Sequence, residues 1–201
     1  FVVKAYEEFT LQSATSIAER FGRDIGHISR VSSVALEIYD KMKKLHGYKL
    51  RERTLLQVSA ILQDIGKYVN VKNHALLSYN TITNLDIVGI NDHERLIIAT
   101  VCYYHNGNIP SMDSPIYNQL SQEDRVMVSK LAAILQISNA INTSHSPKFE
   151  QVSVNMKNGK LNIYLTTLKN INLEKWAFIA KTKLFREVYG LNATIIKRGV
   201  L

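Results

Sequence analysis

The stretch RTLLQVSAILQDIGKYVNVKNHALLSYNTI, residues 53–82, decides the fold. It predicts a helix over 51–65 that opens with polar residues and then becomes apolar on several sides, as central buried helices do. The helix closes with the sequence QDIG (63–66), in which Gly66 is expected to form a left-handed C-cap. The stretch therefore predicts a helical core with a carboxylate, Asp64, at the end of its most buried helix.

Helical periodicity continues on both sides of this stretch. Further helices are predicted over residues 5–21, 24–47, 73–84, 91–105 and 121–142. In the second of these, Asp24 is a good N-cap and Gly47 ends the helix. Its apolar positions recur every three or four residues and are Ile28, Val31, Ala35, Ile38, Met42 and Leu45. The first 146 residues are therefore expected to form one helical body.

The periodicity changes near Pro147. Two alternating segments, 151–156 and 160–166, predict strands, and the Asn158-Gly159 pair between them is a strong hairpin signal. A helix over 172–189 and a short strand over 193–196 follow. The expected fold class is mostly α, with a helical domain over 1–146 and a small α+β unit of order β-β-α-β over 147–201 packed on it.

The composition limits the classes of protein that remain. In 201 residues, 46% are hydrophobic and 21% are charged, which is typical of a globular domain. The single cysteine, Cys102, excludes a disulfide scaffold and suits a reducing compartment, so we expect a cytoplasmic protein. No apolar run reaches the length of a membrane span, so no membrane partner is expected. Because the chain starts at Phe1 rather than Met, we expect it to be part of a longer protein.

The positive charge is concentrated near the end of the chain. The net charge is +8, and residues 151–201 carry nine basic and two acidic side chains, a net charge of +7. A basic segment of this kind favours a polyanionic partner such as nucleic acid or polyphosphate. A solvated lysine face is the alternative, and the sequence leaves both open.

Asp64 is the most informative single position. A carboxylate at the end of a buried helix is costly unless it is paired or bound to a metal. His27 lies beside the apolar stripe of an earlier helix, and the two side chains converging would make half of a metal site. The alternative is that Asp64 pairs with Lys67 and that the histidine is satisfied inside the core. From the residues alone, this alternative is favoured.

The order of these residues adds a resemblance. A histidine on one helix, a ligand pair ending a buried helix and a third group on a late helix resemble the HD phosphohydrolase superfamily. The segments at 27–42, 53–82, 94–110 and 131–145, together with LFREVYG at 184–190, are similar to the C-terminal HD-type region of the Ppx/GppA family. That family comprises exopolyphosphatases and guanosine pentaphosphate phosphohydrolases. The resemblance covers residues 11 to 198 and implies an HD-like helical body.

The resemblance also implies where a metal would bind. The four metal positions of the superfamily fall on His27, Gln63, Asp64 and Asn139. Amides stand at Gln63 and Asn139, where the superfamily has His and Asp, and a neutral amide is a poor ligand for a transition metal. We therefore expect this degenerate site to be empty and the chain to carry no cofactor, whereas a divalent metal, Mg²⁺ or Mn²⁺, is conceivable in the parent enzyme.

Several polar residues of the family's interior are retained. The candidates for binding phosphate or another polyanion are His27, Lys67, His74, His105 and His145. A buried polar cluster that holds the helices together explains the same residues equally well. His46 and His93 match nothing in the family and are expected at the surface.

The resemblance implies an accessory role. In the family, hydrolysis is performed by N-terminal domains of the actin-like ATPase fold, and the HD-type region helps to bind polyphosphate and to form homodimers. This chain alone is expected to show no turnover, since Cys102 is expected to be an inert buried thiol and no G-x-S-x-G motif occurs. Two alternatives remain open: an active HD-type, metal-dependent nucleotide phosphohydrolase, and a non-enzymatic interaction module.

Overall fold

The computed structural model describes residues 2–199, so Phe1 lies outside the described residues. The helices are α1 (Val2–Arg20), α2 (Ile25–Lys41), α3 (Lys43–His46), α4 (Leu50–Leu62), α5 (His74–Ile82), α6 (Asp92–Tyr104), α7 (Pro115–Asn118), α8 (Gln122–Ile141) and α9 (Asn172–Tyr189), with a 3₁₀ helix, η1 (Ile65–Tyr68), after α4. The strands are β1 (Gln151–Lys157), β2 (Lys160–Thr166) and β3 (Asn192–Arg198). The prediction of a mostly helical fold is confirmed.

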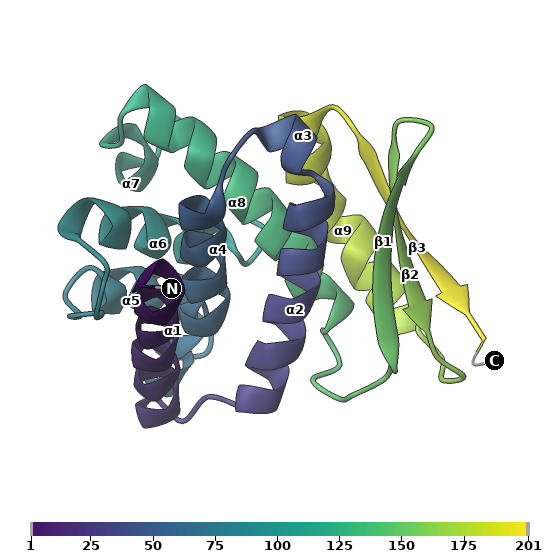
Figure 1. The fold of residues 1–201 in the computed structure, drawn as a ribbon, viewed down its shortest axis with the longest axis horizontal. Coiled ribbons are helices and arrows are strands. Elements are labelled where there is room, and N and C mark those ends of the chain that lie inside the picture. Colours follow the sequence, from purple (N-terminus) through teal and green to yellow (C-terminus); the bar gives the residue numbers. More distant parts are fainter. Residues whose placement is uncertain (1, 200–201) are drawn as a thin grey trace.

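The helix α4 occupies the centre of the helical body. It packs against α1, α2 and α6 and touches α8, so it is surrounded on several sides (Figure 1). This explains why its sequence is apolar on several faces, with Leu56, Val58 and Leu62 fully buried. The end of α4, where Asp64 follows, is therefore held in the interior of the body.

Local sequence signals set the helix boundaries. At the start of α6, the side chain of Asn91 accepts a hydrogen bond from the backbone N–H of Glu94 at 2.9 Å, and Glu94 closes a capping box in return. At the start of α8, Ser121 accepts from the N–H of Asp124 at 3.1 Å. The helix predicted over 24–47 is divided at Met42 into α2 and α3, and α7 was not predicted, because a single turn carries too little periodicity to be recognised.

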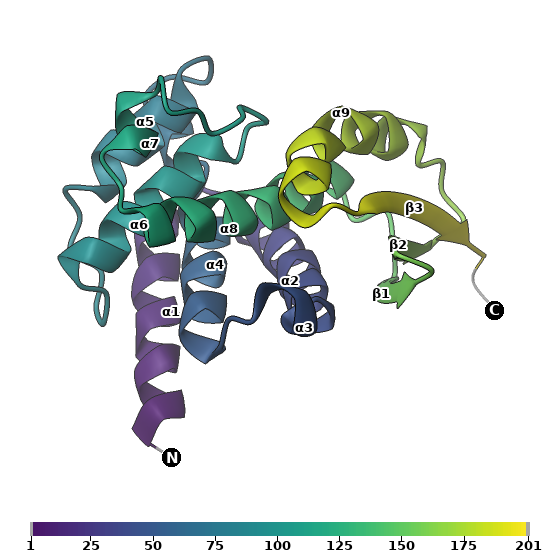
Figure 2. The same cartoon turned by 90° about the horizontal axis from the view of Figure 1, so that it is seen from above.

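The C-terminal unit has the predicted order β-β-α-β. β1 and β2 pair antiparallel, with Gln151 opposite Thr166, and β3 adds to β2 in parallel after the α9 crossover. Leu161, Ile163 and Leu165 alternate toward the interior and are fully buried. Figure 2 shows α9 lying over one face of this sheet and beside α8, so that the sheet occupies the end of the molecule opposite α5 and α7.

The expected domain division after residue 146 stays a prediction, because α8 and α9 pack closely against each other across it. Among the described residues, no helix has both the length and the apolar character that crossing a bilayer requires.

Candidate functional site

The first turn of α2 carries His27 into the interior. Asp24 stands in extended backbone before the helix, and its Oδ1 accepts a hydrogen bond from the backbone N–H of His27 at 3.1 Å. The predicted N-cap at Asp24 is thereby confirmed. With the helix start fixed, the face that carries Ile28 turns toward the core, and His27 is only 4% exposed.

The turn after α4 depends on Gly66, although not in the way the sequence predicted. The expected left-handed C-cap is wrong, because Gly66 lies within η1 and is not among the positive-φ glycines. A Cβ atom at Gly66 would lie 2.2 Å from the carbonyl oxygen of His74 and 2.6 Å from the backbone nitrogen of Ser78. Glycine is therefore required for the close approach of α5 to η1.

Ser78 holds this close contact together. Its hydroxyl donates to the carbonyl oxygen of Gln63 at 2.8 Å and accepts from the N–H of Gly66 at 2.9 Å. Both bonds are buried, so they fix the first turns of α5 against the end of α4. The consequence is that His74, the first residue of α5, lies directly beside Asp64.

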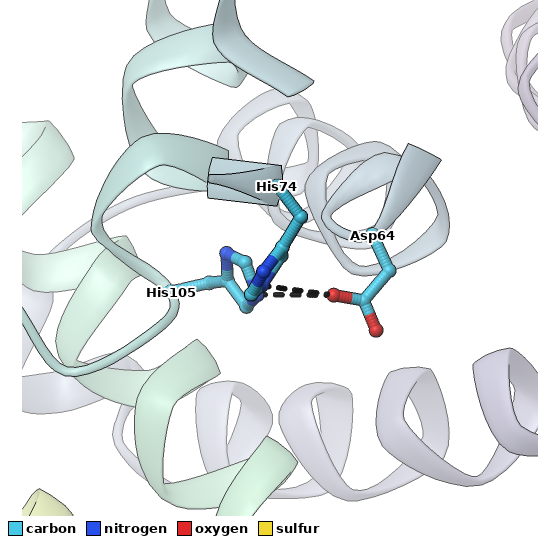
Figure 3. A group of neighbouring side chains, drawn as sticks. All are labelled: Asp64, His74 and His105. Atoms are coloured by element: carbon cyan, nitrogen blue, oxygen red, sulfur yellow. Dashed lines mark hydrogen bonds and ion pairs between the residues drawn. The ribbon is translucent and has the colours of Figure 1, made fainter. Parts of the chain in front are cut away.

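Three buried side chains meet at this point, and we call Asp64, His74 and His105 the Asp64 cluster. Oδ1 of Asp64 lies 3.2 Å from Nε2 of His105 and 3.6 Å from Nε2 of His74, and the two Nε2 atoms are 3.3 Å apart. Figure 3 shows both imidazole rings directed at the same carboxylate oxygen. The other oxygen, Oδ2, accepts a hydrogen bond from Lys67 at 2.7 Å, which is the pairing that the residues alone favoured.

The opposite nitrogen of each ring is bound to the backbone. Nδ1 of His74 lies 2.7 Å from the carbonyl oxygen of Val71, and Nδ1 of His105 contacts the carbonyl oxygen of Cys102. A carbonyl oxygen only accepts, so each ring carries a hydrogen on Nδ1. Both rings are thus oriented by their own helix ends with Nε2 toward Asp64.

The electrostatics of the cluster keep Asp64 ionised. Burial alone raises the pKa of this carboxyl, but the hydrogen bond and charge of His105 and the charge of Lys67 outweigh it and hold the pKa well below its usual value. Burial lowers the pKa of His74, against a smaller upward effect of its hydrogen bond to Val71. At neutral pH the cluster therefore combines a carboxylate with a neutral His74 imidazole.

Asp64 also lines a cavity of about 160 Å³. The residues that line it are Gly22, Arg23, Asp24, His27, Ile28, Gln63, Asp64, Lys67 and His145. The expected meeting of His27 and Asp64 in one pocket is thus present. Pockets for drug-sized ligands span roughly 300 to 1,000 Å³. This one therefore suits a small polar group rather than a whole nucleotide.

His145 covers His27 from the loop after α8. The two rings are stacked, with centroids 3.9 Å apart and an angle of 20° between their planes. His145 has a φ of 54°, which is uncommon for a residue with a side chain, and its carbonyl oxygen accepts from Arg30 at 3.2 Å. Burial, with the charge of His145 as the next cause, lowers the pKa of His27 to about 4. His27 is therefore a neutral imidazole at physiological pH.

The cavity contains polar groups that lack partners within the described residues. Both ring nitrogens of His27 and both amide atoms of Gln63 are buried without a hydrogen bond. Leaving a buried polar group unpaired costs about 1 to 3 kcal/mol. Such groups mark a place where a polar ligand or water would restore the missing bonds.

The remaining predicted residues fall elsewhere. Asn139 is half-buried on α8 and does not line the cavity, so the four superfamily positions are not all gathered there. His93 is exposed as predicted, with Nε2 at 2.9 Å from Oδ2 of Asp124. Cys102 is buried as predicted, and burial raises the pKa of its thiol well above the usual value.

The prediction that His46 lies at the surface is wrong. Gly47, with a φ of 72°, ends α3 and turns the chain so that the ring of His46 packs on Tyr39 at 4.1 Å. Nε2 of His46 donates to the carbonyl oxygen of Tyr39 at 2.9 Å, and Nδ1 accepts from the N–H of Tyr48 at 3.0 Å. His46 is 5% exposed, and both of its nitrogens are satisfied within the fold.

Sequence reasoning missed two features of the site. It did not name Arg23, which lines the cavity, or Arg30, which holds the His145 loop. The position of Arg23 directly before the Asp24 N-cap is a signal that would have placed it at the same helix end as His27. Sequence reasoning also named His74 and His105 without bringing them together, since nothing in the spacing fixes the packing of α5 on α6.

The fold and the site define an α-helical domain closed by a β-β-α-β unit, with a buried carboxylate–histidine cluster beside a small polar cavity. The family model for domain III of the Ppx/GppA phosphatases matches residues 11–184. Because the match covers most of the chain, the chain belongs to the Ppx/GppA phosphatase family and corresponds to its domain III. The family resemblance inferred from the ordered motifs is confirmed.

Proposed function

We propose that this domain binds polyphosphate, or another polyanion, as an accessory part of an exopolyphosphatase-like phosphohydrolase. Actin-like domains of the same chain would hydrolyse polyphosphate or guanosine pentaphosphate, in the cytoplasm, and this domain by itself would not turn substrate over. The observation that carries the proposal is the cavity in which His27 and Gln63 leave buried polar atoms without partners.

The groups around the cavity suit phosphate oxygens. Lys67 and Arg23 line it as charged donors, beside the carboxylates of Asp24 and Asp64, and His145 stacks on His27 within it. Hydrogen bonds from charged donors to phosphate are roughly twice as strong as neutral ones. The unpartnered amide nitrogen of Gln63 is a further donor. One phosphate group in the cavity would therefore meet several donors at once.

Further basic residues follow the cavity in the sequence, on the segment that forms the sheet and α9. Lys169 donates to the carbonyl oxygen of Pro147 at 2.9 Å, and Pro147 lies only two residues beyond His145. The segment 151–201, which forms the sheet and α9, carries a net charge of +7. A long polyanion seated at the cavity would find further weak contacts along this end of the molecule, and many weak contacts together give useful affinity.

The size of the cavity separates this proposal from a nucleotide phosphohydrolase. About 160 Å³ accommodates a phosphate group but not a base, a ribose and phosphates together. The volume of the cavity therefore favours binding of one phosphate group of a polyphosphate chain over enclosure of a whole nucleotide.

Titration of the chain with long-chain polyphosphate at low and at high salt tests the proposal. Binding should be measurable at low salt and fall steeply as salt is added, as it does for nucleic acids. Replacing Arg23 by Gln should weaken binding about tenfold, a loss of about 1.4 kcal/mol. The matched control is Lys44→Gln on α3, which removes an exposed charge away from the cavity. Absence of binding at low salt, or equal losses in both variants, would contradict the proposal.

A second role, homodimerisation, is supported by a separate surface. Leu173, Trp176 and Ile179 recur every third residue on α9 and are 48%, 76% and 71% exposed. Their spacing places them on one side of the helix, and an exposed apolar row of this kind typically seats a partner. We propose that a second copy of the chain covers it.

Sedimentation of wild type and Trp176→Ser tests this role. The wild type should sediment as a dimer and the variant as a monomer, whereas Phe9→Ser, which removes a 61% exposed ring on α1, should remain dimeric. A monomeric wild type would contradict the role and would leave the row to the actin-like domains of the same chain.

A further inference from the structure

The three-stranded sheet buries one face and leaves the other uncovered. Along β2, every second residue from Leu161 to Leu165 is fully buried, whereas the alternate residues are half-buried or exposed. Figure 2 shows α9 over the buried face and, among the described residues, no helix over the opposite one. We call this opposite side the outer face. It consists of every second residue of each strand, counted from Gln151 in β1, Lys160 in β2 and Asn192 in β3.

The outer face carries positive charge and no negative charge. Its basic residues are Lys157, Lys160 and Arg198, and none of its residues, all of which the structure describes, is acidic. Most of its other residues are amides or hydroxyls, Asn162 and Thr194 among them. A strand face that meets only water ordinarily mixes both signs of charge. The composition of the outer face therefore fits a polyanion that also offers hydrogen-bonding groups.

Tyr164 and Arg198 form a stacked pair on the outer face. The guanidinium carbon of Arg198 lies 3.6 Å from the centroid of the Tyr164 ring, in a cation–π contact. Tyr164 belongs to the central strand, and Ile196 on β3 lies directly beside it with 37% of its surface exposed. Aromatic rings and guanidinium planes are groups on which unpaired nucleobases stack. The pair therefore provides a platform for a flat ligand.

The neutral side chains near this pair offer directed hydrogen bonds. Oδ1 of Asn162 accepts from the hydroxyl of Thr194 at 3.0 Å, which orients the amide and leaves its Nδ2 hydrogens for a ligand. Amide side chains of this kind recognise the edges of bases. A seven-residue strand such as β2 spans roughly 20 Å. That length suffices for the two or three bases that sheet surfaces bind in RNA-binding modules.

Single-stranded nucleic acid is the polyanion that would use all of these groups. Polyphosphate carries charge but no flat ring, so it would leave the Tyr164–Arg198 pair and the amides unused. In a duplex the faces of the bases are stacked on one another, so they cannot reach a tyrosine ring. A single strand presents phosphates, base faces and base edges together.

We propose that the outer face binds single-stranded nucleic acid, with a base stacked on Tyr164 and Arg198. Lys157 and Lys160 at the other end of the strands hold the phosphates. The outer face shares no residue with the cavity that contains His27, so the proposal does not rest on polyphosphate binding there.

Fluorescence anisotropy with a short labelled RNA of mixed sequence tests the proposal, with a duplex of the same sequence for comparison. The chain should bind the single strand at low salt more tightly than the duplex. A surface that acts by charge alone would favour the duplex, which has the higher charge density. Equal or tighter binding of the duplex, or no binding of the single strand at low salt, would overturn the proposal.

Two variants separate stacking from charge. Tyr164→Val keeps a strand-forming residue but removes the ring, and it should weaken RNA binding at least about fivefold. The salt dependence should stay unchanged in this variant, because stacking releases no counterions. Lys160→Gln should instead lower the slope of log affinity against log salt by about 0.7. The matched control, Tyr6→Val, removes a 52% exposed ring on α1, far from the sheet, and should bind as the wild type does.

Polyphosphate gives a further control. Tyr164→Val should bind polyphosphate as the wild type does, since polyphosphate offers nothing that stacks. If Tyr164→Val fails to fold, Arg198→Gln replaces an exposed residue at the end of β3 and should weaken RNA binding to a similar extent. Equal losses of RNA and polyphosphate binding in Tyr164→Val, or undiminished RNA binding in the folded variant, would overturn the proposal.

Discussion

His46 and the Asp64 cluster are both buried and rich in imidazole, yet their ring nitrogens are used in opposite ways. His46 donates from one nitrogen to Tyr39 and accepts at the other from Tyr48, so its hydrogen bonds are complete. In the Asp64 cluster, His74 and His105 donate from Nδ1 to the backbone and direct Nε2 toward one carboxylate oxygen. Both groups of histidines are therefore buried, and the partners of their ring nitrogens distinguish them.

The cavity beside the cluster shows a third pattern, in which buried polar atoms have no hydrogen-bond partner. His27 and Gln63 have no partners within the described residues, whereas every imidazole nitrogen of His46 has one. This difference supports polar ligand binding in the cavity and a purely structural role for His46. Variants at Gly66, His46, His27 and Gln63 test this difference.

Gly66→Ala should have the largest effect. The added Cβ would lie 2.2 Å from the carbonyl oxygen of His74, so α5 must move away from η1 and the Asp64 cluster must open. We expect a loss of about 3 kcal/mol in the free energy of unfolding, measured by urea denaturation. Gly159→Ala is the control, since its Cβ meets nothing within 4 Å and only backbone strain, about 1 kcal/mol, is added. Equal losses in the two variants would contradict the packing argument.

His46→Leu should cause the second-largest loss of stability. The change fills a similar space but leaves the carbonyl oxygen of Tyr39 and the N–H of Tyr48 without their buried partner. We expect about 2 kcal/mol of destabilisation in urea denaturation, with polyphosphate binding unchanged. Unchanged stability would contradict the structural role of His46.

The pH dependence of stability probes His27. Its folded pKa of about 4 lies below the ordinary value of 6.5, so the unfolded chain takes up the proton first as the pH falls. Neutral His27 therefore contributes fully to the free energy of unfolding above pH 6.5. This contribution is lost progressively toward pH 4, by about 1 to 2 kcal/mol between pH 7 and pH 5. Other buried histidines act in the same direction, so the measurement compares wild type with His27→Asn in EDTA. The variant should lose less stability over this interval, and an unchanged slope would disprove the assignment.

Gln63→Leu should have the smallest effect, and one of opposite sign. The amide of Gln63 is buried without a partner, so an apolar side chain of similar length removes a desolvation cost. We expect a gain of about 1 kcal/mol in the free energy of unfolding. The same variant should bind polyphosphate more weakly, because it removes a donor from the cavity. A loss of stability would mean that the amide is already satisfied.

Much of the fold could be predicted from local signals. The Asp24 N-cap, the Asn158-Gly159 turn and the strand alternation around Ile163 each depend on neighbours in the sequence, and each was predicted correctly. Gly66 was assigned the wrong role, because the reason for glycine there is a residue of α5 that approaches from outside the turn. Local chemistry therefore predicts elements better than it predicts close contacts between them.

The same limit applies to the candidate site. His27 and Asp64 could be expected in one pocket because the family resemblance supplied their tertiary relationship, and they do line one cavity. The convergence of His74 and His105 on one oxygen depends on how α5 packs against α6, which no spacing encodes. His46 was misplaced because it matches nothing in the family and was therefore expected at the surface, whereas the turn at the left-handed Gly47 leaves its ring packed on Tyr39.

The contrast between His46 and the Asp64 cluster is tested most directly by nitrogen NMR of the imidazole rings at neutral pH. The account predicts a hydrogen on Nδ1 of His74, which faces the carbonyl oxygen of Val71, and on Nε2 of His46, which faces the carbonyl oxygen of Tyr39. A His74 ring without a hydrogen on Nδ1, or a His46 ring without one on Nε2, would contradict the account.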